Sequence, residues 1–379
     1  MMSQDAPDLR PTQSIFRDLQ NSVKTAITFP RAANLAGPPV NPFLYGNGSG
    51  AGEAPKIALI NIMDNAEGTE KHFLRILKKS APDAAITLCR LDCTELGEKY
   101  FAEYEYLLSA RYQSWREALE DDFDLVIVTG INRGRLSYPE LIAEYPDFWN
   151  EMVELFAHLH QATKTGQVGH AHFVCWSAFA AMKSLYGIEK YVGKSKHYGL
   201  FAHEVADKDH PLLKNILQGG LLVPHSRYSH IDEQPLRTAI ARHGGLVLMD
   251  CVNGDGGPAI WTLEEGRLSC SINHLEYGID TLHREYLRDS ARDVHFPWPH
   301  CYPYHPRLAG PVDESAGVNV GESAGENEFL QAIFDRLSEV CASFYGNLVA
   351  HGCALHIQQA ESRSPARPYA HPLPLTASQ

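Results

Sequence analysis

Three continuous apolar segments constrain the fold of this 379-residue chain more than any other feature of its sequence. They lie at Lys56–Met63, at Phe123–Gly130 and at the run that ends with Phe173 and Val174. A strand that is solvated on one face alternates apolar with polar residues, whereas a strand covered on both faces is apolar throughout, as in the centre of a parallel sheet. The three segments therefore predict the central strands of an α/β protein.

The segments between these strands carry helical patterns. Apolar residues recur at spacings of three and four within Tyr145–Gln161, and Thr69–Lys79 shows a similar stripe. Further strands are predicted at residues 85–91, 220–224, 246–251, 258–263 and 268–273. Strands that alternate with helices predict an α/β fold with a doubly wound, mostly parallel sheet flanked by helices, which binds its ligands at the carboxyl ends of the strands.

The ends of the chain differ in composition from this core. Residues 1–54 are rich in proline and close with a glycine-rich run, which predicts a flexible N-terminal arm or linker. The α/β domain is expected at residues 55–295, followed at 296–350 by a C-terminal extension with one amphipathic helix at 328–348. The proline-containing segment 351–379 is expected to be a disordered tail.

Composition excludes several classes of function. The chain has 33 basic and 46 acidic residues, and its net charge of -13 argues against nucleic acid as a partner. No apolar run approaches the roughly 20 residues needed to cross a bilayer, so no membrane partner is expected. The eight cysteines include no CxxC pair, which favours reduced thiols in a cytoplasmic protein. Cys89 and Cys93 lack a second ligand pair nearby, so no metal site is predicted.

Cys175 falls at the junction between a buried strand and a helix. The strand run ends at Val174, and the small and apolar residues after Cys175 are those of a closely packed helix. At a helix N-terminus, the macrodipole and the unpaired N–H groups favour the thiolate, as a nucleophile requires. The alternative interpretation is a small buried hydrophobe, the usual role of a free cysteine.

A base for this thiol is available in His274, which is followed two residues later by Glu276. Both lie at the end of a predicted strand, and in extended chain two residues at this spacing point to the same face. Glu276 could then orient the imidazole and stabilise its charged form, as the third member of a catalytic triad does. The alternative is a chance pair on a surface strand, because the chain contains 19 histidines.

The order of these features resembles the class I glutamine-amidotransferase-like superfamily, whose fold is doubly wound α/β. The glutaminases of that superfamily usually carry glycines beside the nucleophile, whereas here the neighbours include the bulky Trp176, which we take to separate acyl transfer from amide hydrolysis. The closer resemblance is to the homoserine O-succinyltransferase family, over roughly residues 55–292. It is carried by the blocks Phe173-Val174-Cys175-Trp176, Leu185-Tyr186-Gly187-Ile188, Pro224-His225-Ser226-Arg227-Tyr228, His274-Leu275-Glu276-Tyr277, Thr281-Leu282 and Glu285-Tyr286-Leu287-Arg288-Asp289.

The resemblance implies a homodimeric enzyme of methionine biosynthesis that uses acyl-CoA, either succinyl-CoA or acetyl-CoA, as co-substrate and no tightly bound cofactor. Cys175 would take the acyl group from CoA as a thioester, His274 would act as base and acid, and Glu276 would orient it. The oxyanion would be bound by the N–H of Trp176 and by N–H groups of the loop that begins at Gly130 and Ile131.

The acceptor pocket implied by the family needs a cation for the carboxylate and an acid for the ammonium group of an amino acid. Arg288 and Glu285 match these positions and share one face of a helix. Lys196 and Ser226 also match substrate-contacting positions, and Arg227 lies beside Ser226. The alternative for Glu285 and Arg288 is an exposed ion pair, the commoner outcome for such a pair.

Acyl selection in the family is attributed to the end of the loop that follows the strand at residues 123–130. Gly134 occupies that position, where glycine leaves room for a succinyl group and glutamate restricts the site to acetyl. Arg133 or Arg135 could bind the terminal carboxylate of such a group. A glycine required by a left-handed turn would explain Gly134 equally well.

Two departures from the family pattern leave the substrates open. The family's lysine pair after the first strand is replaced by Asn65 and Ala66, and its proline in the oxyanion loop is replaced by Asn132. We therefore also consider O-acetyl transfer to homoserine and acylation of serine by a paralogue. An amidase on the same fold and a binding protein that has lost its chemistry are further alternatives.

Overall fold

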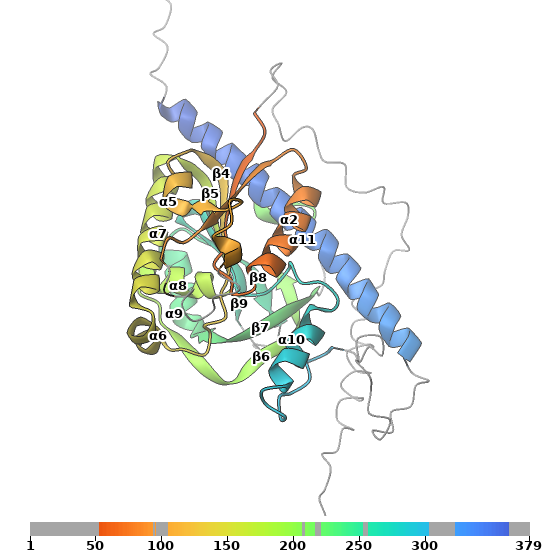
Figure 1. Ribbon diagram of the computed structural model, residues 1–379. Coiled ribbons are helices and arrows are strands. Elements are labelled where there is room, and N and C mark those ends of the chain that lie inside the picture. The colour runs from red at the N-terminus through yellow and green to blue at the C-terminus, as the bar shows by residue number, and fades with distance from the viewer. Residues whose placement is uncertain are drawn as a thin grey trace, which may run out of the picture.

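The computed structural model describes residues 53–93, 95, 105–206, 209–216, 221–252, 257–302 and 323–363. Within these residues, ten strands form one sheet in the order β3-β2-β1-β4-β5-β10-β9-β8-β6-β7. Figure 1 shows this sheet with helices around it. The strands are β1 (Lys56–Ile60), β2 (Ala85–Arg90), β3 (Gln113–Ser114), β4 (Phe123–Val128), β5 (Val168–Val174), β6 (Lys190–Val205), β7 (Leu221–Ile231), β8 (Val247–Cys251), β9 (Pro258–Leu263) and β10 (Leu268–Ser271).

Helices follow most of the parallel strands, as the sequence predicts. The α-helices are α2 (Ala66–Ser80), α5 (Trp115–Ala118), α6 (Tyr138–Glu144), α7 (Pro146–Thr165), α8 (Trp176–Tyr186), α9 (Glu233–Arg242), α10 (Thr281–Ser290) and α11 (Ser323–Arg363). Two short 3-10 turns, Pro211–Leu213 and Glu264–Gly266, lie between strands. The predicted doubly wound α/β fold is confirmed.

The sheet has a parallel half and an antiparallel half. The pairings from β3 through β2, β1, β4 and β5 to β10 are all parallel. From β10 onward, β9, β8, β6 and β7 pair antiparallel. The sequence predicts no strand at β6, although β6 and β7 form the longest ladder of the sheet. Residues 190–205, which follow α8, thus enter the sheet between β8 and β7.

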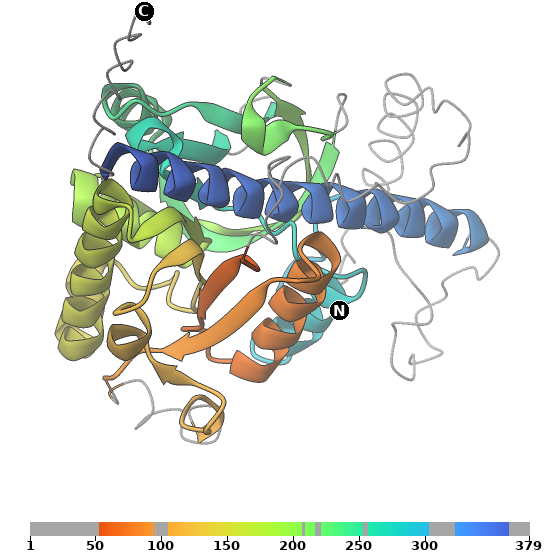
Figure 2. The same ribbon diagram turned by 90° about the horizontal axis from the view of Figure 1, so that it is seen from above.

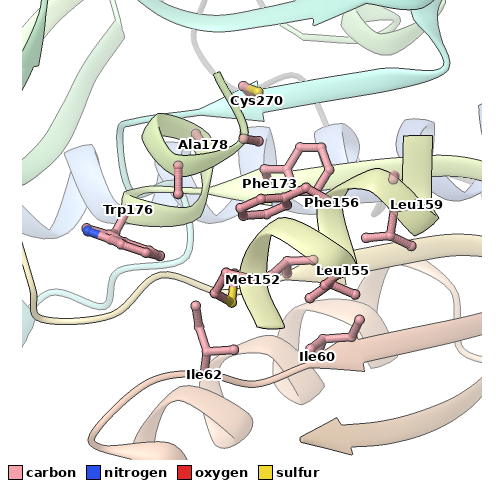
Figure 3. Close-up of a cluster of buried hydrophobic side chains, with 14 of the residues drawn as sticks. Ile60, Ile62, Met152, Leu155, Phe156, Leu159, Phe173, Trp176, Ala178 and Cys270 are labelled. Carbon is pink, nitrogen blue, oxygen red and sulfur yellow. The ribbon is translucent and has the colours of Figure 1, made fainter. Parts of the chain in front are cut away.

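Both faces of the parallel half are covered, which explains its continuous apolar runs. In β1, Ala58 and Ile60 belong to the core on one face, whereas Ile57 and Leu59 belong to the core on the other. On the first face, α7 and α8 pack their apolar side chains on the sheet, and Figure 3 shows this cluster with Ile60 at its edge. On the second face lie α2 and α11.

The long helix α11 crosses the second face beside α2, and its N-terminal end projects beyond the sheet (Figure 2). Its closest approach is at Gly352, where an added Cβ would lie 2.0 Å from the backbone oxygen of Asp124 and 3.4 Å from the Cβ of His170. Only glycine permits such proximity between a helix backbone and a strand.

The expected disordered tail is corrected for residues 351–363, which continue α11. Two histidine contacts hold this part of the helix, since His351 Nε2 lies 2.9 Å from the backbone oxygen of Gly266 and His356 Nδ1 lies 3.0 Å from Asp124. The C-terminal helix is therefore part of the core of the α/β domain. Residues 1–52 and 364–379, on which the predicted arm and the rest of the tail fall, lie outside the described residues. None of the described helices combines the length and the apolar character needed to span a membrane.

Candidate active site

Cys175 lies between the last residue of β5 and the first residue of α8, as the sequence predicts. Its backbone has φ 54° and ψ -115°, a conformation that residues with a Cβ rarely adopt. A nucleophile on such a sharp strand-to-helix turn projects from the carboxyl edge of the sheet. Cys175 is accordingly only half-buried, although Val174 and Trp176 on either side are buried.

Two neighbours hold this turn in place. The Ser177 hydroxyl accepts a hydrogen bond from the N–H of Val174 at 3.0 Å and lies 2.9 Å from the backbone oxygen of Val128, so it joins the ends of β5 and β4. The Cys175 N–H donates to the backbone oxygen of Ser271 at 2.6 Å, which fixes the turn to β10. Sequence reasoning assigned no role to Ser177, because its contacts depend on strand order.

Gly130 brings the loop after β4 against Cys175. A Cβ added at Gly130 would lie 3.0 Å from the Cys175 Cβ and 3.4 Å from the Trp176 nitrogen, so a larger residue would crowd the turn. As the first residue of α8, Trp176 has an N–H with no acceptor inside its helix. The backbone near the thiol can therefore contribute N–H groups to an oxyanion.

His274 and Glu276 meet as predicted, but not in an extended strand. β10 ends at Ser271, and the His274 N–H then donates to the backbone oxygen of Pro224 at 2.9 Å, which turns the chain toward β7. In the turn that follows, His274 Nδ1 lies 2.6 Å from Glu276 Oε1, and both side chains are buried. The carboxylate thus fixes the imidazole with Nε2 free for the thiol.

The charge state of His274 depends on both partners. Burial alone would lower the pKa of His274, but the carboxylate of Glu276 and the thiol of Cys175 raise that pKa well above its usual range. Nε2 makes no well-aligned hydrogen bond to any described residue, so its interaction with Cys175 is mainly one of charge. Such contacts commonly align only when substrate binds. A thiol, an imidazole and a carboxylate are therefore together at the edge of the sheet.

A second polar network adjoins this triad. The Tyr277 ring stacks on the His274 ring with a centroid distance of 4.3 Å, and its hydroxyl donates to Glu285 Oε1 at 2.6 Å. The other oxygen of Glu285 accepts from the Ser226 hydroxyl and from Lys196 Nζ, the latter at 3.1 Å. Burial acts to raise the pKa of Glu285, but these donors hold it below its usual range, so the carboxylate stays charged.

Arg288 lies at the outer side of this network rather than against Glu285. Its guanidinium forms two hydrogen bonds to the Asp289 carboxylate, at 2.8 and 3.0 Å, and Asp289 also accepts from Lys196 at 2.9 Å. Of the predicted acceptor residues, Lys196, Ser226 and Glu285 therefore lie together, whereas Arg288 joins them through Asp289.

The sequence matches the model of the homoserine O-succinyltransferase family over residues 51–347, a span that contains all of these groups. The chain belongs to this family. The family is one of acyltransferase enzymes, and its match extends over all ten described strands and into α11.

Relatives within the homoserine O-succinyltransferase family differ in the acyl group that their names state. A homoserine O-succinyltransferase from Pelagibacterium halotolerans is 30% identical over 64% of this chain and 72% of its own length. A homoserine O-acetyltransferase from Bacillus cereus is 29% identical over 66% of this chain and 77% of its own length. A solved structure, a glutamine amidotransferase from Thermotoga maritima, is 15% identical, with a TM-score of 0.48 over 79% of this chain and 99% of that chain.

The side chains of Trp176 and Ile131, which the sequence predicts to act in acyl binding, point into the core. The Trp176 side chain lies in the buried apolar cluster that Figure 3 shows. Its ring packs on that of Phe148, with ring centroids 5.5 Å apart. Its bulk therefore lies in the core under the nucleophile, which corrects the interpretation of that bulk as a selector of chemistry. Ile131 is likewise a core side chain, so both residues can act in the site only through their backbones.

The two arginines considered for an acyl carboxylate have other contacts. Arg133 forms an ion pair with Asp64 at 3.0 Å. Arg135 donates to the Tyr228 hydroxyl, and its guanidinium lies 4.2 Å from the centre of that ring. Gly134 contacts Ser229, whose hydroxyl donates to the Gly134 backbone oxygen at 3.1 Å, and its backbone is not left-handed. The turn explanation for Gly134 is therefore wrong.

The sequence missed a buried group of three possible metal ligands, His203, His225 and Cys251, whose donor atoms lie within 4.8 Å of one another. His225 Nδ1 accepts from Arg227 Nε at 3.3 Å, and an arginine can only donate, so neutral His225 carries its proton on Nε2. That proton is shared with His203 Nε2 at 2.9 Å, and Cys251 Sγ lies 3.1 Å from the same atom. The nitrogen atoms that a metal would need are engaged with each other, so this group is a hydrogen-bonded network.

Proposed function

We propose that this protein is an acyl-CoA-dependent O-acyltransferase that transfers a succinyl group to the hydroxyl of homoserine through a thioester on Cys175. One observation carries the mechanism: the 2.6 Å contact between His274 and Glu276 beside a cysteine on a strained strand-to-helix turn. Family membership supports the reaction, and the names of the relatives support homoserine as the acceptor.

In the first half-reaction, the Cys175 thiol gives its proton to His274 Nε2, and the thiolate attacks the carbonyl carbon of the acyl-CoA thioester. The tetrahedral intermediate collapses with cleavage of the carbon–sulfur bond to CoA, whose sulfur takes the proton from His274. Glu276 stabilises the imidazolium that exists between these transfers. The product is an acyl thioester on Cys175.

In the second half-reaction, His274 Nε2 takes the proton of the acceptor hydroxyl, which attacks the acyl carbon. The bond to Cys175 Sγ breaks, and the sulfur regains its proton from His274. In both steps the oxyanion would be bound by the N–H of Trp176 and by N–H groups of the loop after Gly130, each of which is worth about 3 kcal/mol of transition-state stabilisation.

The acceptor would bind at the network beside the triad. Glu285 is charged and buried next to the Tyr277 ring that stacks on His274, so it is placed to receive the ammonium group of an amino acid. Arg288 has a partly exposed guanidinium at the edge of the same network and is placed to receive the carboxylate. A planar guanidinium suits a carboxylate because it can donate two parallel hydrogen bonds.

The test measures CoA release by the purified protein with succinyl-CoA or acetyl-CoA and with homoserine, serine or no acceptor. We expect release that requires homoserine and that gives parallel double-reciprocal lines, the pattern of a ping-pong reaction. Activity with serine alone would overturn the acceptor. Release of ammonia from glutamine without use of CoA esters would instead favour an amidase.

A further inference from the structure

Arg227 is a buried cation for which the described residues provide no carboxylate partner. Its side chain is only 4% exposed, and its contacts are with uncharged groups: Nε with His225, and Nη1 with the Ser229 backbone oxygen at 2.8 Å and with His230 Nδ1 at 3.0 Å. Its Nη2 has no hydrogen-bond partner among the described residues. A buried cation of this kind is costly unless an anion joins it.

The surroundings keep Arg227 in one orientation. Behind it, His225 and His203 form the head-to-tail network already described, and the Nδ1 of His203 ends that network at the Phe201 backbone oxygen at 2.8 Å. Burial lowers the pKa of His203 to about 4 and that of His225 well below its usual range, so both rings are neutral. Burial also lowers the pKa of Arg227 to about 10, which leaves it charged at neutral pH.

The Arg227 side chain lies on the opposite face of β7 from the acceptor network. The loop after β4 lies between this face and Cys175, since a Cβ added at Gly130 would lie 3.0 Å from the Cys175 Cβ. Successive residues of a strand point to opposite faces, so Ser226, which contacts Glu285, directs its side chain away from that of Arg227. On the same face as Arg227, the Ser229 hydroxyl donates to the backbone oxygen of Gly134, which belongs to the loop after β4. Arg227 Nη1 donates to the Ser229 backbone oxygen, so the guanidinium is connected to this loop.

We propose that Arg227 is the binding site for the terminal carboxylate of a dicarboxylic acyl group carried by CoA, such as succinyl. The inference rests on the proposed function and adds the residue that selects the donor. The carboxylate would bind Nη2 and the edge of the guanidinium, supply the anion that the site lacks, and hold the acyl carbon over Cys175.

The experiment measures the rate of acyl-enzyme formation by intact mass with two donors of equal chain length, succinyl-CoA and butyryl-CoA, which differ in the terminal carboxylate. The variants are Arg227→Met and Arg227→Lys, and Arg237→Met is the matched control because Arg237 pairs with Asp250 and Glu233 on the surface. Succinyl-CoA should be preferred by the wild type and by the control. In Arg227→Met, the rate with succinyl-CoA should fall about 10- to 100-fold and that with butyryl-CoA should change little.

Arg227→Lys keeps the charge without the planar fork and should lie between the wild type and Arg227→Met. It also tests the proposal if Arg227→Met does not fold. An equal loss with both donors in either variant would show that Arg227 acts on the nucleophile or on folding, and would overturn the proposal. If the wild type forms no adduct with any donor, the proposed function itself fails.

Discussion

The strained backbone at Cys175 predicts that any side chain with a Cβ at this position lowers the stability of the fold. At φ 54° a side chain with a Cβ is disfavoured by about 1–2 kcal/mol, whereas glycine adopts this region freely. In ordinary backbone the same comparison favours alanine over glycine by about 0.5–1 kcal/mol, because glycine has more freedom in the unfolded chain. Replacement of Cys175 by glycine should therefore give a protein that is more stable than the alanine variant by about 1 kcal/mol.

The assay is urea denaturation of Cys175→Gly and Cys175→Ala, both of which should be inactive. The glycine variant should unfold at the higher urea concentration, with the same dependence of unfolding free energy on urea. Both variants lose the thiol, so the comparison isolates the backbone. An alanine variant that equals or exceeds the glycine variant in stability would refute the strained turn. The wild type should fall below the glycine variant if the strain outweighs the packing of the thiol.

Two further predictions concern the triad and the C-terminal helix. Glu276 raises the pKa of His274 in the folded protein, so the stability that this pair adds is fully present below the unfolded pKa of 6.5 and is lost as pH rises through the raised pKa. Glu276→Gln should therefore lower the urea midpoint most near pH 6 and least in alkaline solution, and a pH-independent loss would contradict the charge pairing. In α11, Gly352→Ala should destabilise the protein by about 1–3 kcal/mol because its Cβ would overlap the Asp124 backbone. Gly346→Ala is the matched control, since its Cβ would lie 3.4 Å from the nearest atom. This substitution should raise the unfolding free energy by up to about 1 kcal/mol. If both substitutions changed the unfolding free energy in the same direction, the close contact at Gly352 would be refuted.

The features that the sequence predicts correctly are local in sequence or rest on the family resemblance. Cys175 could be placed at a strand-to-helix turn because an apolar run ends beside it and a helical run begins. The contact of His274 with Glu276 could be predicted from their spacing, although a turn and not a strand produces it. Short-range patterns thus fix which elements form and where they end.

The features that the sequence missed depend on contacts between distant strands. The direct partners of Arg227 are His225, Ser229 and His230 on its own strand, β7. The next strand, β6, contributes the neutral His203 behind His225, and none of the described residues contributes a carboxylate, which the residues around Arg227 in the sequence do not show. The direction of the Trp176 side chain depends on α7, which supplies Phe148. Side-chain direction and ion pairing follow from strand order, which residue patterns do not encode.

The central claim, a covalent acyl-enzyme on Cys175, is tested most directly by intact-mass measurement after brief incubation with succinyl-CoA. The wild type should gain the mass of one succinyl group, carried on the peptide that contains Cys175, and should lose it when homoserine is added. Cys175→Ala should gain nothing, and His274→Ala should react far more slowly while it keeps its fold. A wild-type protein that releases CoA and acylates homoserine with no adduct on Cys175, or a Cys175→Ala variant that retains activity, would contradict the account.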